Sequence, residues 1–166
     1  YKIYFWMKKI NFSFHFSPNT TANFITIEFD ENLTVIDTPG FVLDNSIYNF
    51  LSFNEVNKLS PKKEIKVKTY QIKEGETVIL EDYFRIDYKS NFKNSFSFYM
   101  NNNLKYKRMK AKNTRELKTL AKVSLHVMDN QDVVINGLGF IKVVKESDIV
   151  VYTIDEKLIS VRDKMI

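Results

Sequence analysis

The sequence predicts an α+β protein, in which a short N-terminal part with strands and one helix precedes a mainly antiparallel β domain. Residues 61–166 contain about ten short β-branched or aromatic runs at spacings of roughly ten residues, which is typical of an antiparallel sheet or a barrel-like domain. The charge also changes there: residues 1–60 carry 4 basic and 6 acidic side chains (net −2), and residues 61–166 carry 21 and 14 (net +7). We therefore expect a domain boundary near Ser60 and Pro61.

The N-terminal part, residues 1–60, is expected to contain two strands, a turn and a helix. Residues 24–29 alternate with the two-residue period of a strand, and residues 33–36 form a short apolar run suited to a buried strand. Residues 30–32 are predicted to form the turn between them. Asp44, Asn45 and Ser46 can cap a helix over residues 47–56.

The second part, residues 61–166, is expected to consist almost entirely of strands. Only residues 111–121 have a helical pattern, and turns are expected at Gly75 and at residues 101–103. The predicted strands cover residues 64–72, 77–80, 83–89, 95–100, 104–109, 123–128, 133–135, 140–144, 149–154 and 158–161.

The composition excludes several classes of site. There is no cysteine, so a disulfide scaffold, a cysteine nucleophile and a thiolate metal site are all excluded within this chain. The two histidines, His15 and His126, leave little for a histidine-based metal site, and we find no nucleophile–base constellation, so no catalytic residue is predicted. No stretch approaches the roughly 20 apolar residues that span a bilayer, and we expect no membrane partner and a cytoplasmic location, with an organellar matrix as the alternative.

A four-residue motif in the N-terminal part indicates a nucleotide switch. Asp37, Thr38, Pro39 and Gly40 follow an apolar strand and match the D-x-x-G element of P-loop GTPases. In that element the Asp37 carboxylate would face the Mg²⁺ shell, and Gly40 would let a backbone N–H approach the γ-phosphate. The alternative is a strand that ends in an ordinary Pro-Gly turn.

Residues upstream of this motif fit the other switch of a GTPase. Thr21 lies ahead of the predicted strand pair, where a GTPase needs a threonine hydroxyl on Mg²⁺, and Thr20 is the alternative ligand. We thus predict Thr20, Thr21, Asp37 and Gly40 as nucleotide-binding residues and Thr21 and Asp37 as Mg²⁺ ligands. The sequence contains neither G-x-x-x-x-G-K-[S/T] nor N-K-x-D, however. We therefore expect the chain alone to bind neither GTP nor Mg²⁺ tightly.

Several segments together resemble the YqeH-type circularly permuted GTPases of ribosome biogenesis. These segments are SPNTTANFITIEF, LTVIDTPGF, KKEIKVKTYQIKEGETV, FRIDY, SFSFYMNNNL, VVINGLGFIKV and ISVRDKMI. The family order places the guanine-reading motif and the phosphate loop before the two switches, and a separate C-terminal domain after them. The resemblance covers almost all of residues 17–166. Phe140 replaces the tryptophan of the family's G-L-G-W segment, and the family's zinc knuckle is absent.

The resemblance implies that the chain is the C-terminal part of a GTP-dependent assembly factor for the small ribosomal subunit. Residues 1–60 would be a partial GTPase domain, completed by an upstream part of that domain. Residues 61–166 would be a basic domain that binds ribosomal RNA or the small subunit. The alternatives are a stand-alone RNA-binding β domain without GTPase activity and a non-functional fragment.

A basic segment of the second part is the predicted RNA-binding site. Six cations lie within eleven residues, with Tyr106 among them and Tyr99 shortly before. Basic side chains provide salt-dependent phosphate affinity, and aromatic rings can stack on unpaired bases. The alternative is a solvated basic face. The predicted RNA-binding residues are Tyr99, Lys105, Tyr106, Lys107, Arg108, Lys110, Lys112 and Arg115.

Three further features have structural interpretations. Gly137 and Gly139 lack the third glycine and the following helix of a dinucleotide loop, so we expect a tight β-turn or bulge. Arg85 and Asp87 share one face of a strand and are expected to form a structural ion pair. His126 is interpreted as an ordinary strand histidine, and a surface or RNA-facing role is the alternative.

Overall fold

The computed structural model describes residues 25–30, 33–37, 44–114 and 121–165. The chain divides into two compact units, Tyr1–Leu43 and Asp44–Ile166. Within the first unit, β1 (Ile25–Asp30) and β2 (Leu33–Asp37) pair antiparallel, and the register shifts between Glu28 and Asp30. The two strands predicted there are confirmed.

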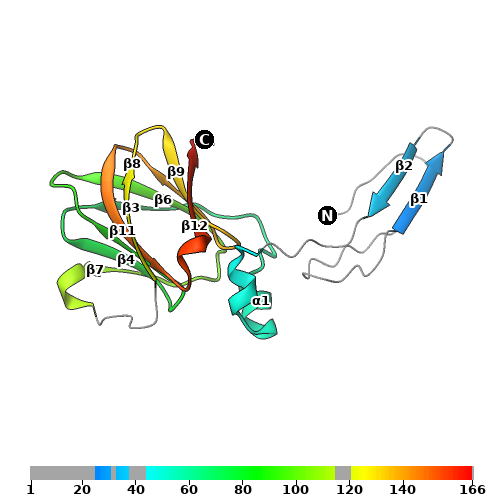
Figure 1. Cartoon of the computed structure of the whole chain (residues 1–166), viewed down its shortest axis with the longest axis horizontal. Coiled ribbons are helices and arrows are strands. Elements are labelled where there is room, and N and C mark those ends of the chain that lie inside the picture. The colour runs from blue at the N-terminus through cyan, green and yellow to red at the C-terminus, as the bar shows by residue number, and fades with distance from the viewer. Residues whose placement is uncertain (1–24, 31–32, 38–43, 115–120, 166) are drawn as a thin grey trace. The chain divides into compact units, whose positions relative to one another are not determined.

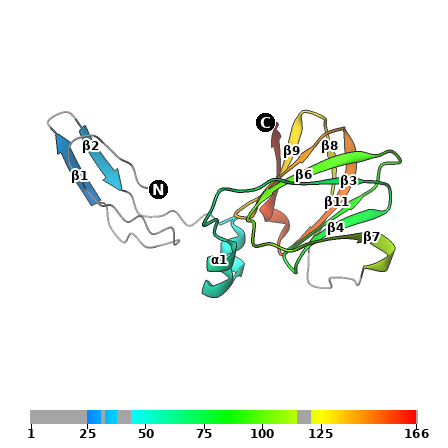
Figure 2. The same cartoon turned by 180° about the vertical axis from the view of Figure 1, so that it is seen from behind.

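The second unit consists of two five-stranded antiparallel sheets (Figures 1 and 2). One sheet has the strand order β12-β9-β10-β6-β3, and the other has the order β7-β4-β5-β11-β8. We call them the β6 sheet and the β5 sheet, after an inner strand of each. The mainly antiparallel β domain predicted from the sequence is therefore confirmed. The strands are β3 (Lys68–Ile72), β4 (Glu76–Leu80), β5 (Phe84–Tyr88), β6 (Asn94–Met100), β7 (Tyr106–Lys110), β8 (Ala121–Val127), β9 (Gln131–Ile135), β10 (Gly139–Val143), β11 (Ser147–Thr153) and β12 (Ile159–Asp163).

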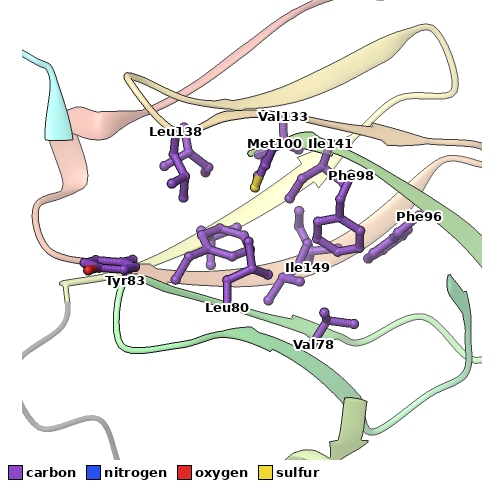
Figure 3. Packing of buried hydrophobic residues seen from close by; sticks show 14 of the residues in the cluster. Val78, Leu80, Tyr83, Phe96, Phe98, Met100, Val133, Leu138, Ile141 and Ile149 are labelled. Carbon is purple, nitrogen blue, oxygen red and sulfur yellow. The ribbon is translucent and has the colours of Figure 1, made fainter. Parts of the chain in front are cut away.

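The core lies between the two sheets and follows the two-residue period of the strands. On β6, Phe96, Phe98 and Met100 are buried and alternate with half-buried residues. They face apolar side chains of the β5 sheet, such as Val78 and Ile149 (Figure 3). The fold is thus a layered β structure, and each sheet also has an outer face that does not take part in this core.

The helical region before β3 differs from the predicted single helix. The structure has a 3₁₀ helix η1 (Ile47–Phe50), then a break, then α1 (Phe53–Leu59). The break arises because Ser52 starts a new helix with a capping box: its hydroxyl accepts from the Glu55 N–H, and the Glu55 carboxylate accepts from the Ser52 N–H at 2.9 Å. The prediction of one helix over residues 47–56 is therefore wrong, although helical structure is present.

Both short helices pack on the β domain. The Ile47 N–H donates to the Asn136 carbonyl at 3.0 Å, and the Asn101 side-chain amide donates to the Leu59 carbonyl at 2.6 Å. Ile47 and Leu59 are buried in the β-domain core. The division of the chain into units accordingly falls at Leu43, upstream of the boundary that the charge change predicts near Ser60 and Pro61.

Two other predicted elements are shorter than the sequence suggests. Of the alternating residues 64–72, only Lys68–Ile72 pairs as a strand, while the Lys66 N–H donates to the Asn102 side chain at 2.8 Å. The predicted α-helix over residues 111–121 is not observed at either of its two ends, which are the parts of it that the structure describes. It begins as a short 3₁₀ helix η2 (Ala111–Asn113), and Ala121 starts β8; residues 115–120 lie outside the described residues. Among the described residues, no helix is long and apolar enough to cross a membrane.

The two glycines of the G-L-G segment have positive φ angles: Gly137 lies in the turn between β9 and β10, and Gly139 is the first residue of β10, which confirms the predicted turn. At Gly139 (φ +141°), a Cβ would lie 2.2 Å from the Tyr99 carbonyl oxygen of the neighbouring strand β6. At Gly137 (φ +83°), a Cβ would lie 2.7 Å from the Ser46 hydroxyl. These glycines therefore let the turn approach both β6 and the segment that precedes η1.

We expect Gly139→Ala to destabilise the β domain by more than about 1 kcal/mol, because the added methyl group meets backbone and the φ angle is unfavourable for a side chain. Gly75→Ala is the matched control. Gly75 has a φ of +71°, but a Cβ added there would meet nothing within 4 Å, so this variant reports the backbone cost alone. Urea denaturation measures both free energies of unfolding. An equal loss of unfolding free energy in the two variants would show that the close approach of residue 139 to the Tyr99 carbonyl adds no destabilisation.

Candidate nucleic-acid interface

The predicted basic segment coincides largely with β7, an edge strand. β7 pairs only with β4 in the β5 sheet, and its other edge is not paired in that sheet. Lys105 precedes this strand, and Lys112 follows it in η2. The side chains of five cations are exposed: Lys105, Lys107, Arg108, Lys110 and Lys112. The structure thus brings these predicted residues together on one edge of the domain.

The described cations of this segment form no ion pairs, although the Lys105 N–H donates to the Glu81 carboxylate at 3.1 Å. Within the described part of the chain, no carboxylate lies within ion-pair distance of any of these five side chains, although Lys110 is the register partner of Glu76. Arg108 instead donates through Nη1 to the Gln71 carbonyl at 2.8 Å. Lysines on an edge strand also discourage edge-to-edge aggregation of the protein, and this is the alternative to RNA binding as a role for the lysines of β7. The unpaired positive charge remains available to phosphates in either case.

Tyr106 does not take the position that RNA stacking requires. Its ring packs against Tyr70 (6.0 Å between centroids) and Phe98 (5.4 Å), and the Lys68 ammonium lies 4.3 Å from its centroid. Its hydroxyl is buried without a hydrogen-bond partner, and burial raises the pKa of Tyr106. In a strand, alternate side chains point to opposite faces, and Tyr106 points inward. Its predicted role as a base-stacking residue therefore does not fit the structure.

Tyr99 lies on the other sheet, with its side chain on the outer face. Its ring stacks on that of Phe140, its register partner on β10, with centroids 4.5 Å apart and planes within 4°. The Arg162 guanidinium lies 4.6 Å from the Phe140 centroid. Sequence reasoning did not identify Phe140 or Arg162 as functional residues. The signal at Phe140 was its place in the G-L-G segment, where it replaces the tryptophan of the family that the chain resembles.

The predicted nucleotide-binding residues are mostly outside the described residues, as is Arg115. Thr20, Thr21 and Gly40 fall there, and Asp37 is the last residue of β2. In the described ranges, no group of three or more His, Asp or Glu side chains could hold a metal ion.

Arg85 and Asp87 form the predicted ion pair on the outer face of the β5 sheet. Arg85 Nε and Nη2 donate to the two Asp87 carboxylate oxygens at 2.7 and 2.8 Å, in a bidentate geometry. The exposed fractions are only 7% for Arg85 and 2% for Asp87. The guanidinium also lies 4.7 Å from the centre of the Tyr152 ring. Both side chains of the pair are almost fully buried, as expected for a structural ion pair.

His126 bridges two carboxylates at the other edge of the β5 sheet. Nδ1 lies 2.8 Å from Asp148, and Nε2 lies 3.0 Å from Glu146. A neutral imidazole has one N–H, so only the protonated ring can donate to both acids. The hydrogen bond to Asp148, followed by that to Glu146, raises the pKa of His126 above its ordinary value of 6.5. The flanking acids make this edge unsuitable for phosphate, in contrast to β7.

The raised pKa gives a testable pH dependence. Because the folded pKa exceeds the unfolded one, the stabilising interaction is fully present below about pH 6.5 and is lost as the pH rises through the folded pKa. We expect Asp148→Asn to lower the pKa of His126 more than Glu146→Gln does, since the Asp148 hydrogen bond is the larger cause. An NMR titration of the ring protons measures both values. A His126 pKa that neither substitution changes would contradict the bridge.

Comparison with known proteins supports a distant relationship. No protein-family model matches the chain. Over 100 residues the chain is 33% identical to a protein of Bacillus subtilis (strain 168) that is named uncharacterized protein YqeH. The match covers 60% of this chain but only 27% of the YqeH protein, so this chain spans about a quarter of that relative's length. These findings support a YqeH-like relationship.

Proposed function

We propose that this chain is the C-terminal part of a GTP-dependent assembly factor for the small ribosomal subunit, and that its β domain binds RNA. The observation that carries the RNA-binding part is the row of exposed cations along the edge strand β7, which form no ion pairs among the described residues. The similarity to YqeH supports the family assignment. Phosphate contacts of this kind provide most of the non-specific affinity of a protein for nucleic acid.

The partner is best tested with purified ribosomal subunits. We expect the chain to sediment with small subunits more than with large subunits at moderate salt, and to be released as the salt concentration rises. Equal binding to both subunits would leave RNA binding in place and remove the small subunit as the specific partner. Absence of the chain from both pellets would remove the ribosomal proposal.

The nucleotide part of the proposal rests on the D-T-P-G motif and the upstream threonines. Under it, Thr20, Thr21, Asp37 and Gly40 belong to switches that an upstream segment completes, and GTP and Mg²⁺ bind only to the completed domain. We expect calorimetry to detect no micromolar binding of GTP to this chain. We also expect the DNA upstream of residue 1 to encode N-K-x-D and then G-x-x-x-x-G-K-[S/T]. Micromolar GTP affinity of the chain alone would contradict the proposed division.

A stand-alone RNA-binding domain is the second candidate. It is favoured by the second unit, Asp44–Ile166, which has its own hydrophobic core between two complete sheets. The upstream DNA distinguishes the two candidates, because a start codon near Tyr1 without the two missing motifs would favour the stand-alone domain.

A further inference from the structure

The outer face of the β6 sheet carries an ordered stack of two aromatic rings and a guanidinium. Tyr99 on β6 and Phe140 on β10 are register partners, and their rings are nearly parallel at 4.5 Å. Arg162 lies on β12, on the opposite side of β10 from β6, and its guanidinium is 4.6 Å from the Phe140 centroid. The strand order therefore places Phe140 between Arg162 and Tyr99, with Tyr99 at the end of the stack.

An additional ring would extend the stack at Tyr99. Tyr99 is partly exposed, and among the described residues its ring contacts no aromatic ring other than that of Phe140. Every nucleobase has a flat π-face that can stack on such a ring, which makes aromatic side chains the usual platforms for unpaired bases. The ring of Tyr106 already packs against Tyr70, Phe98 and the Lys68 ammonium, which distinguishes it from Tyr99.

The charge of this face suits a polyanion. Lys142 and Arg162 lie on it, and no ion pair is formed by either within the described ranges. Nε and Nη2 of Arg162 are buried and have no hydrogen-bond partner there, and neither has Oδ1 of Asp132, its register partner on β9. The acid on this face, Asp132, is fully buried and accepts from the Met165 N–H at 3.1 Å. Two partly exposed cations and one buried acid thus leave this face with a net positive charge, with the hydroxyls of Ser97 and Thr69 (2.8 Å apart) beside it.

This face adjoins the basic edge strand. β3 is the edge strand of the β6 sheet next to β6, and Arg108 of β7 donates to the β3 carbonyl of Gln71 at 2.8 Å. A nucleic-acid strand that contacts the cations of β7 can therefore continue across β3 toward Tyr99. Duplex RNA holds its bases in the helical stack, so only a single strand can place a base on the ring.

We propose that the stack of Tyr99, Phe140 and Arg162 receives one unpaired base of RNA, and that the β domain consequently prefers single-stranded RNA to duplex RNA. This inference rests on the proposed RNA-binding function and specifies the form of RNA that the domain takes. The cations of β7 hold phosphates without regard to strandedness, while Tyr99 selects an unpaired base.

The test compares a fluorescein-labelled single-stranded 12-nucleotide RNA with a duplex of the same length, by fluorescence anisotropy with the full chain. We expect Tyr99→Leu to weaken single-strand binding by about 5- to 150-fold, which is the range for stacking one base on an aromatic side chain. Duplex affinity and the salt dependence of binding should stay unchanged, because no cation is removed. Tyr99→Phe should restore the affinity, since it keeps the ring.

The control is Phe92→Leu, which removes a different exposed ring beside a lysine: Lys145 lies 5.8 Å from the Phe92 centroid. It should leave both affinities unchanged. The inference is overturned if Tyr99→Leu, with an unchanged far-UV circular dichroism spectrum, binds the single strand as the wild type does. If that variant is misfolded, Phe140→Leu provides the same test. A wild-type chain that binds no RNA of either form would instead overturn the proposed function itself.

Discussion

Replacing Lys107 and Lys110 together by glutamine is expected to weaken binding to single-stranded RNA by about 25-fold at 0.1 M salt. Each lost phosphate contact lowers the slope of log K against log salt by about 0.7, so two contacts remove roughly 1.4 log units between 1 M and 0.1 M. Both side chains are exposed on β7, and within the described residues neither has an ion-pair partner. Arg108 is left in place because its guanidinium also bonds to β3.

A titration at four salt concentrations measures both the affinity and the slope. The matched control replaces Lys122 and Lys157, two exposed lysines that lie away from β7, by glutamine. Lys122 lies on β8, the other edge strand of the same sheet. The control pair removes the same net charge and should change the slope little. Identical slopes for the two double variants would contradict a phosphate-binding role specific to β7.

Replacing Arg85 by methionine is expected to lower the free energy of unfolding by about 3–5 kcal/mol. The substitution leaves the Asp87 carboxylate, which is 2% exposed, without its bidentate partner. Lys89 lies 3.8 Å from that carboxylate and compensates only weakly, since its own side chain is 47% exposed and solvent screens its charge. Urea denaturation measures the loss.

The double variant Arg85→Met, Asp87→Leu should recover most of the lost stability, because an apolar pair of similar volume has no charge to desolvate. The exposed pair between Lys58 and Glu81 is the comparison: Lys58→Met should cost much less, since solvent screens that pair. If Arg85→Met were as stable as the wild type, the pair would not contribute to the fold in the manner described.

The sequence predicts the strands well where burial on one face imposes a strict alternation. Phe96, Phe98 and Met100 show this on β6, and the predicted and observed strands agree there within one residue. Alternation fails at residues 64–67, where the side chain of Asn102 bonds to the backbone in place of a neighbouring strand. That contact joins segments distant in the chain, so a local pattern does not contain it.

Helix prediction failed for local reasons that can be identified. Ser52 has the features of an N-cap, and Glu55 three residues later completes the capping box that starts a second helix. The pattern across residues 47–56 is continuous in hydrophobicity, which obscures this start. At Ala121, β-sheet pairing with Thr153 outweighs the helical propensity of alanine.

The sequence predicts the positive charge of the candidate interface, but it does not predict how its side chains are arranged in space. The cluster of lysines indicates a phosphate-binding segment, and the structure places it on a free edge. Strand periodicity does not show which face of β7 points toward the core. The sequence alone therefore predicts Tyr106 as an RNA-binding residue, whereas in the structure its ring packs beside Phe98. The stack of Tyr99 with Phe140 depends on the pairing of β6 with β10, which only the three-dimensional fold determines.

The central claim is that the β domain binds RNA through the cations of β7. Measuring the affinity of the chain for a single-stranded RNA at 50 and 200 mM KCl tests it most directly. If the five described cations, Lys105 to Lys112, contact phosphates, the affinity should fall about 100-fold across this range, because each contact contributes about 0.7 to the slope. An affinity that does not change between the two salt concentrations, or the absence of RNA binding at 50 mM, would contradict the claim.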